Sequence, residues 1–206
     1  MSAMTGRLGT IDRLYVLDAG TAIAPDRSVY TPGKWQGEPV TLSCHAYLLQ
    51  RRGEWILWDT GIDERLGDEP EGRIIAHNIR GLVARPLTAQ FAEIGLAPAD
   101  IGTVLLSHAH FDHIGNARLC RHARWYIQRR EHEAMFGEDY RAFGYAPSLY
   151  ACLRQARGRT DGRRFRSAWR RLRASYFNAW PHAGPLLAAG APRPRRGGSA
   201  VRRCGA

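Results

Sequence analysis

The sequence lacks the features of a membrane protein and of a cysteine-based site. No uninterrupted apolar run approaches the thickness of a bilayer, and no basic segment followed by a long apolar one stands at the N-terminus. A membrane span or a secretory signal would need such segments, so we expect a cytoplasmic protein without membrane association. The four cysteines, Cys44, Cys120, Cys152 and Cys204, have neither zinc-site nor redox spacing. We expect them to be reduced, mostly structural thiols.

Acidic residues are almost missing from the C-terminal quarter of the chain. Residues 1–150 contain 16 Lys and Arg against 18 Asp and Glu, whereas residues 151–206 contain 14 Arg and one acid, Asp161. The formal net charge of +11 therefore comes entirely from the tail. A basic arm with interleaved aromatic residues is a candidate for binding nucleic acid or an acidic membrane. The first 150 residues give no support to that function, and we consider nucleic acid an improbable partner.

Three histidines and one aspartate crowd residues 107–113 (SHAHFDH), directly after an apolar run. Imidazole nitrogen and carboxylate oxygen are the usual donors for Zn²⁺ and related ions. Four adjacent polar side chains buried for structural reasons alone would each need a separate partner. His108, His110, Asp112 and His113 are therefore candidate metal ligands. They are more than one tetrahedral ion needs from a single segment, which indicates two ions.

Strand and helix patterns alternate through the first 150 residues, and 206 residues are enough for one domain with a core. The expected strands are residues 14–17, 41–49, 55–58 and 125–127, and the expected helices are residues 88–94 and about 131–136, with a short turn at 98–100. Thr88 is the expected cap of the first helix and Gly95 its end. Glu131 and Glu133 have the pattern of ordinary acids in a first helical turn.

The pattern His-x-His-x-Asp-His after an apolar strand resembles the signature of the metallo-β-lactamase superfamily. Residues 42–49 (LSCHAYLL) and 55–61 (WILWDTG) resemble the early hairpin and the Asp-Thr-Gly turn of that family. Residues 107–116, with Gln128 and Glu131 downstream, are most similar to its N-acyl-homoserine lactonase branch. The resemblance implies a mixed α/β fold, an αββα sandwich, of which the first 150 residues encode one half.

The resemblance also implies roles for individual residues. His108 and His110 would bind a first ion, and Asp112 and His113 a second, with Asp112 as the expected catalytic residue. Asp59, in the Asp-Thr-Gly turn, would orient an imidazole or would simply form the turn. The implied cofactor is zinc, as two ions, and the implied substrate is a small acyl-homoserine lactone or a similar ester. Hydrolysis of the lactone ring would yield an acyl-homoserine, a quorum-quenching reaction.

Residues 151–206 do not encode the second half of such a sandwich. The Arg-rich stretches have no strand alternation, and residues 191–198 (APRPRRGG) can form neither a helix nor a ladder. The family resemblance requires a further His from a Thr-Pro-Gly-His-type loop, a bridging Asp and a last His, and none of those motifs is present. His182, the one histidine of the tail, is a further ligand only if the tail is authentic.

A displaced reading frame is our explanation for this tail. Back-translated and read one nucleotide later, residues 178–185 (NAWPHAGP) permit Thr-Pro-Gly-His-Thr-Pro-Gly-His, and residues 200–203 permit Leu-Ser-Gly-Asp. Residues 169–173 permit Gly-Asp-Gly-Ser-Val, a plausible hairpin turn. We therefore predict a frame displacement between about residues 150 and 166, which leaves an out-of-frame or disordered tail and a site without all of its ligands.

Other readings stay open beside these. The same loop occurs in thioesterase-type and β-lactam-hydrolysing relatives, and the basic tail keeps a nucleic-acid-binding function as the alternative outside enzymes. His45, within an apolar strand, is expected to be a satisfied core residue, and His122 and His132 are expected to face solvent. Tyr30 and Tyr47 could line a substrate channel, although the core is the favoured place for both.

Overall fold

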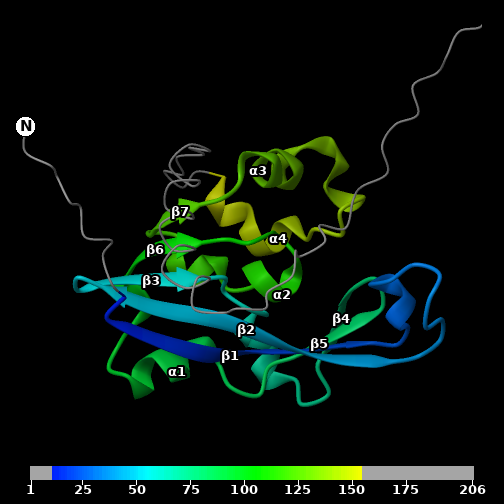
Figure 1. Cartoon of the computed structure of the whole chain (residues 1–206), viewed down its shortest axis with the longest axis horizontal. Helices are drawn as coiled ribbons and strands as arrows, with labels where there is room; N and C mark the ends of the chain where they lie inside the picture. The colour runs from blue at the N-terminus through cyan, green and yellow to red at the C-terminus, as the bar shows by residue number, and fades with distance from the viewer. Residues whose placement is uncertain (1–10, 155–206) are drawn as a thin grey trace, which may run out of the picture.

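Seven strands form one mixed sheet in the part of the chain that the structure describes (Figure 1). The structure is a computed structural model, and it describes residues 11–154. The strands are β1 (Arg13–Ala24), β2 (Val40–Arg51), β3 (Glu54–Trp58), β4 (Arg73–Ala76), β5 (Ile79–Leu82), β6 (Ile101–Leu105) and β7 (Arg124–Tyr126). The four strands at residues 14–17, 41–49, 55–58 and 125–127 coincide with β1, β2, β3 and β7, and the expected apolar strand before the imidazole-rich segment is β6. The expected mixed α/β class is confirmed.

The order of the strands places two loops side by side. The order is β4-β5-β1-β2-β3-β6-β7, and Gly53, with a φ of 80°, forms the tight turn between the antiparallel strands β2 and β3. Strands β3, β6 and β7 are parallel, with Trp58 paired to Leu105 at the ends of β3 and β6. Because the carboxyl ends of parallel strands meet at one edge, the segments after β3 and β6 become neighbours.

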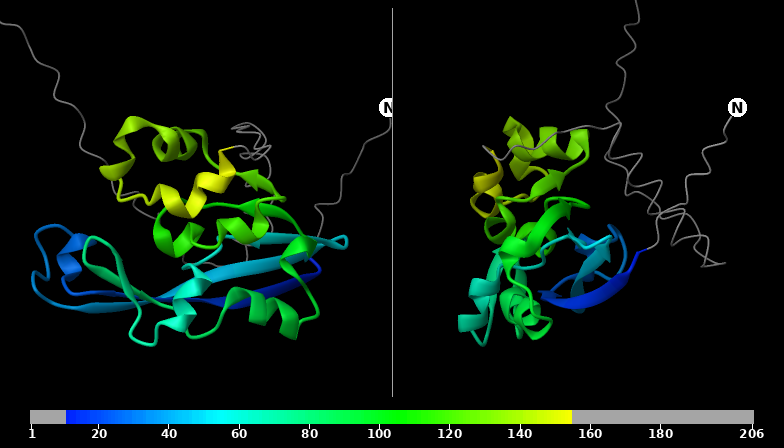
Figure 2. Two further views of the ribbon diagram at one scale, coloured as in Figure 1. Left: turned by 180° about the vertical axis from the view of Figure 1, so that it is seen from behind. Right: turned by 90° about the vertical axis from the view of Figure 1, so that its left-hand side faces the viewer.

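Helices lie at both ends of the sheet: the first is beneath strands β1 and β2, and the last two are above β6 and β7, as Figure 1 and Figure 2 show. They are α1 (Leu87–Glu93), α2 (Phe111–Ile114), α3 (Arg129–Phe136) and α4 (Pro147–Tyr150), with 3-10 turns at Arg27–Val29, Glu64–Asp68, Pro98–Asp100, Ala117–Cys120, Glu138–Arg141 and Ala151–Leu153. Leu48, Leu57 and Val104 are fully buried, as is Phe91 of α1. Burial of such a side chain contributes about 2 kcal/mol relative to exposure. These residues belong to the hydrophobic core.

The opposite side of the β1–β2 hairpin exposes large apolar side chains. Leu14 and Val16 alternate with the half-buried Tyr15 and the buried Leu17, and they are 46% and 59% exposed. Tyr47, which pairs with Val16 in the register of β1 and β2, is 39% exposed. Apolar side chains at every second position of neighbouring strands are typical of a sheet that packs on both faces.

Some details of the sequence interpretation are wrong. Helix α1 begins at Leu87, so Thr88 lies inside it and does not cap it; instead the Thr88 amide and hydroxyl both donate to Oε2 of Glu64 at 3.0 Å. Gly95, with a φ of 75°, follows the helix as expected. Tyr30 and Tyr47 are 47% and 39% exposed, where the core was favoured. An aromatic residue in an apolar run carries no signal of which face it occupies.

The expectations for the C-terminal tail fall outside the described residues. The described residues end at 154, four residues after the expected domain boundary at residue 150, so His182 and the Arg-rich tail from residue 155 onward lie outside them. Cys44, Cys120 and Cys152 are free thiols, and Cys204 lies outside the described part. Between residues 11 and 154, none of the helices has the length and hydrophobicity that a bilayer span would need.

Backbone hydrogen bonds join the two neighbouring loops. The amide of Thr60 donates to the carbonyl of His113 at 2.6 Å, and the amide of Gly115 donates to the carbonyl of Gly61 at 2.7 Å. Asn116 is 2% exposed, and its side-chain amide donates to the carbonyl of Thr60 at 2.7 Å. The segment after α2 is therefore fixed against the turn after β3.

This close approach predicts that position 115 accepts no side chain. A β-carbon at Gly115 would lie 2.3 Å from the amide nitrogen of Asp63 and 2.6 Å from the carbonyl oxygen of Gly61. Both are backbone atoms, so we expect Gly115→Ala to lower the free energy of unfolding by about 3 kcal/mol, the upper range for overpacking. Chemical denaturation measures this loss. As a control, Gly102→Ala meets only a carboxylate oxygen of Glu54, at 3.4 Å; equal midpoints for the two variants would contradict the prediction.

Candidate metal centre

The imidazole-rich segment leaves the sheet at the end of β6 and turns into α2. Leu106 still donates its amide to the carbonyl of Tyr126 at 3.0 Å, so the segment starts from a fixed point. His110 has an extended backbone (φ −67°, ψ 155°) at the N-terminal end of α2, and its carbonyl accepts the amides of His113 and Ile114. The helical turn therefore folds Asp112 and His113 back toward the two earlier histidines.

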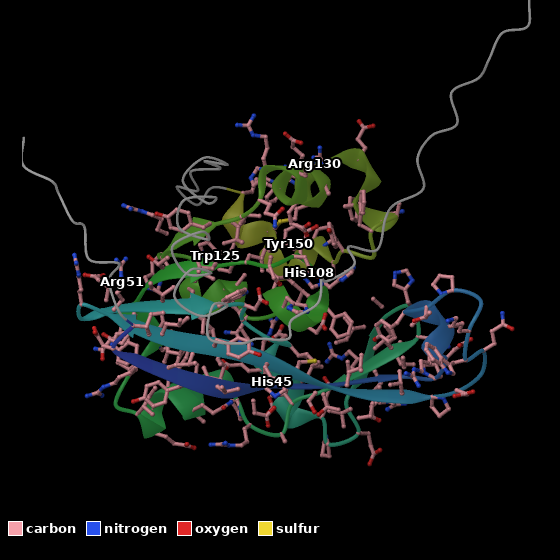
Figure 3. The ribbon with its side chains drawn as sticks, viewed as in Figure 1. His45, Arg51, His108, Trp125, Arg130 and Tyr150 are labelled. Carbon is pink, nitrogen blue, oxygen red and sulfur yellow. The ribbon has the colours of Figure 1, made fainter. Side chains whose placement is uncertain are left out.

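The structure brings the predicted ligands together. The ring centroids of His108 and His110 are 4.7 Å apart, and those of His108 and His113 are 4.0 Å apart. Nε2 of His113 lies 3.3 Å from Oδ2 of Asp112. Figure 3 places His108 between the sheet and the helices above it. Three imidazoles and a carboxylate thus share one small region.

Asp59 holds this segment from the side of the sheet. It is 5% exposed and has a φ of 58°, a left-handed conformation that Asp tolerates better than most residues. Its carboxylate accepts the amide and the hydroxyl of Ser107, both at 2.7 Å, and lies 2.8 Å from Nδ1 of His113. The turn-forming role is therefore accompanied by the contact with an imidazole that an orienting role requires.

The partners of two imidazoles decide which ring nitrogen is free. In neutral His113, Nδ1 carries the proton because it faces the Asp59 carboxylate, which leaves the Nε2 lone pair directed toward Asp112. Nε2 of His110 lies 2.9 Å from the carbonyl oxygen of Phe143, which can only accept, so the lone pair of neutral His110 is on Nδ1. Such fixed tautomers are what metal-binding histidines require.

The protonation states follow from burial and from these carboxylates. Burial lowers the pKa of His113, but hydrogen bonds to Asp112 and Asp59 outweigh it and raise that pKa to about 9. Burial, and then the positive charges of His113 and His110, lower the pKa of His108 to about 4. Burial opposes ionisation of Asp112, yet its contact with His113 holds the pKa of that carboxyl below its usual value. The cluster thus keeps one proton at a place where a cation could replace it.

The side chains fit a divalent cation in donor type and in tautomer. Imidazole nitrogen and carboxylate oxygen suit zinc and its neighbours. Between residues 11 and 154, however, no three His, Cys, Asp or Glu side chains converge closely enough to form a closed metal site by themselves. The described residues therefore offer part of a coordination sphere, with Asp112 and His113 as its closest donor pair.

Sequence reasoning missed two residues that support the segment. Glu131 lies in the first turn of α3, as expected, but it is more than an ordinary first-turn acid because it accepts the amide of Ala109 at 2.6 Å. Ser107, named only as part of the pattern, binds Asp59 through both its amide and its hydroxyl. Both contacts span 22 residues or more of sequence, so no local pattern could have indicated them.

The other histidines are apart from the cluster. His45 is exposed on β2, as Figure 3 shows, so the expectation of a core residue is wrong: it follows the solvent-facing alternation of the strand. His122 is exposed as expected. His132 is half-buried, and its ring lies 4.8 Å from that of Phe136, so it packs on its own helix more than a solvent-facing side chain would.

A mixed sheet whose parallel strands end in an imidazole-rich loop and a buried aspartate defines a class of metal-binding α/β proteins. The family model of the metallo-beta-lactamase superfamily matches residues 39–167. The chain belongs to this superfamily, as its sequence motif predicted.

The curated relatives that match this chain include N-acyl homoserine lactonases. The chain is 30% identical over 141 residues to the N-acyl homoserine lactonase AiiA of Bacillus thuringiensis subsp. kurstaki, which covers 64% of this chain and 54% of the relative. It is 30% identical over 116 residues to the N-acyl homoserine lactonase AiiB of Agrobacterium fabrum, covering 50% of this chain and 42% of the relative. The chain spans about half the length of the curated relatives it matches.

Solved structures agree on the fold. An N-acyl homoserine lactone hydrolase with N-hexanoyl-L-homoserine bound at its catalytic metal centre matches with a TM-score of 0.59 and 24% identity, over 73% of this chain and 59% of that chain. AidC, a dizinc quorum-quenching lactonase, matches with a TM-score of 0.50 and 20% identity, over 74% and 58%. The predicted metallo-β-lactamase-like fold is confirmed.

The pKa values predict how the stability of the metal-free protein depends on pH. The pKa of folded His113, about 9, is above its ordinary value of 6.5, so protonated His113 stabilises the fold fully below pH 6.5 and this contribution is lost as the pH rises through 9. Its full size is about 3 kcal/mol. His108 acts in the opposite sense, because its lowered pKa removes stability as the pH falls from 6.5 toward 4.

Denaturation of the chelator-treated protein between pH 4 and 10 measures both effects, with a maximum expected near pH 6.5. His113→Asn should abolish the decline between pH 6.5 and 9, since no imidazole then loses a proton there, whereas the decline above pH 9 that comes from the raised pKa values of the Cys44 and Cys120 thiols should remain. His122→Asn, a change at an exposed position, should keep both declines. A decline between pH 6.5 and 9 that persists unchanged in His113→Asn would contradict the assignment.

Proposed function

We propose that this site belongs to a metal-dependent hydrolase that opens the lactone ring of N-acyl homoserine lactones, a quorum-quenching activity. The observation that carries the proposal is the gathering of His108, His110, Asp112 and His113 on one loop, with Asp59 behind it. Family membership and the names of the curated lactonases support this substrate class. The proposed cofactor is zinc, as two ions, and the proposed partner is a small-molecule lactone.

Each residue has a task that its contacts support. His108 and His110 would hold one ion, the latter through Nδ1, because its Nε2 faces the carbonyl of Phe143. Asp112 and His113 would hold the other, with Asp112, whose Oδ2 lies 3.3 Å from Nε2 of His113, as the proposed catalytic residue. Asp59 keeps the proton on Nδ1 of His113 and so leaves Nε2 available. Divalent ions at these residues would acidify water toward neutral pH and polarise an ester carbonyl.

The proposed reaction is the hydrolysis of a lactone. Water adds to the lactone carbonyl, the ring C–O bond breaks, and the alkoxide takes up a proton, which gives an acyl-homoserine. The site must therefore stabilise negative charge on the carbonyl oxygen and then on the leaving oxygen. Divalent ions held by these side chains, whose ring centroids lie 4.0 Å (His108 and His113) and 4.7 Å (His108 and His110) apart, would supply positive charge where that negative charge develops.

The chain as written should have little or no such activity. The described residues supply only part of a coordination sphere, and the chain spans about half the length of its curated relatives. We propose that residues 1–150 are the N-terminal part of the domain and that residues 151–206 are translated out of frame. The family match covers residues 39–167, so it extends past residue 150 and leaves residues 168–206 unmatched. DNA sequencing across the codons of residues 150–166 tests this proposal, and an intact frame whose codons cannot spell the shifted motifs would refute it.

Proton release from N-hexanoyl-homoserine lactone tests the function itself. We expect the frame-restored protein, loaded with zinc, to hydrolyse this lactone, and the chain as written to hydrolyse it little or not at all. Asp112→Asn in the frame-restored protein should reduce the rate at least about 100-fold, because it removes a metal ligand beside the reacting atoms. His122→Asn should leave the rate unchanged. A frame-restored protein that binds two zinc ions but leaves the lactone intact would overturn the proposed substrate.

A further inference from the structure

A single carboxylate oxygen joins the metal loop to the helices above it. Oε1 of Glu131, in the first turn of α3, accepts the amide of Ala109 at 2.6 Å and the hydroxyl of Tyr145 at 2.7 Å. Ala109 is fully buried and stands between His108 and His110 in the sequence. Its amide therefore has no access to water as an alternative partner, and the bond to a carboxylate is charge-assisted and strong.

Through Tyr145, the carboxylate of Glu131 is also linked to His110. The ring of Tyr145 meets the ring of His110 edge-on, with centroids 5.5 Å apart and planes at 65°. The carbonyl oxygen of Phe143, two residues earlier, lies 2.9 Å from Nε2 of His110. The ring of Phe143 stacks on that of Tyr145 at 5.6 Å. Glu131 thus connects the backbone beside His110 to the segment that fixes its tautomer.

A simpler explanation for Glu131 is the favourable interaction of an acid with the N-terminal end of a helix. That explanation accounts for an acid anywhere in the first turn, but it does not account for where the carboxylate points. Glu133, on the same helix, is exposed, whereas Glu131 is half-buried and directed at the loop. The direction of the Glu131 side chain therefore indicates that it positions the loop.

We propose that Glu131 is a positioning residue, which fixes the backbone between His108 and His110 and holds Tyr145 against His110 so that both imidazoles face a metal ion. The inference rests on the proposed metal-binding function. Tyr145 donates a hydrogen bond to Glu131 but could not fix the loop in its place, since the phenol has no hydrogen bond to the loop backbone among the described contacts. Supporting residues of this kind typically change metal affinity 10- to 100-fold when removed.

Zinc binding by the full 206-residue chain tests the proposal, with the ion alone as the probe and a chromophoric chelator as the competitor. Glu131→Ala should weaken zinc binding about 10- to 100-fold. Glu131→Gln should recover most of the affinity, because its Oε1 can still accept both bonds. Glu133→Ala, the matched control on the same helix, should bind zinc as the unaltered chain does.

Nuclear magnetic resonance of the metal-free chain supplies a readout that general destabilisation does not give. In Glu131→Ala the amide of Ala109 should lose its protection from hydrogen exchange, and the Nε2–H tautomer of His110 should lose population, while the hydrogen bond between Nδ1–H of His113 and Asp59 stays. Tyr145→Phe should affect His110 and spare the Ala109 amide. If Glu131→Ala fails to fold, Glu131→Gln and Tyr145→Phe carry the same comparison.

The outcomes separate this proposal from the proposed function. Zinc binding that Glu131→Ala leaves unchanged, or that Glu133→Ala weakens equally, would overturn the positioning role and leave the metal site intact. An Ala109 amide that stays protected in Glu131→Ala would also overturn it. A chain that binds no zinc in any form would overturn both the metal site and the role of Glu131.

Discussion

The carboxylate of Asp59 is the interaction on which the site depends. Asp59 follows β3 and has a left-handed backbone conformation. Its carboxylate accepts hydrogen bonds from the amide and the hydroxyl of Ser107 and from Nδ1–H of His113. One buried anion thereby fixes both ends of the metal loop, the first at Ser107 and the last at His113. The parallel pairing of β3 and β6 makes this possible, because it brings the two strand ends to the same edge of the sheet.

The loop is supported from two sides with different chemistry. Asp59 acts from the sheet and carries a negative charge that favours a proton or a cation on His113. Glu131 acts from α3 on the backbone at Ala109, and the carbonyl of Phe143 holds His110. Between these supports the tautomers of His110 and His113 are set before an ion arrives, and outer partners of this kind raise metal affinity. Within residues 11–154 the face of the hairpin at Val16 is open and the donors form part of a coordination sphere, and the chain spans about half the length of the curated relatives it matches.

Periodicity and clustering predicted most of what is local. The alternation within β1, β2 and β3 and the density of donors at residues 107–113 are properties of short segments, and the structure contains both. Contacts between distant segments could not be predicted in this way. Glu131 has the same local pattern as Glu133, and only the fold distinguishes them. The cap assigned to Thr88 fails for the same reason, because a distant partner, Glu64, binds its hydroxyl and amide.

The central claim is that the loop from His108 to His113 binds a divalent metal ion through imidazole and carboxylate. X-ray absorption at the zinc edge of the full chain is its most direct test. The account predicts nitrogen and oxygen neighbours at about 2.0–2.1 Å, with imidazole scattering that disappears when His108 and His113 are both replaced by Ala. Sulfur neighbours at about 2.3 Å, or a zinc signal that survives the double replacement unchanged, would contradict it.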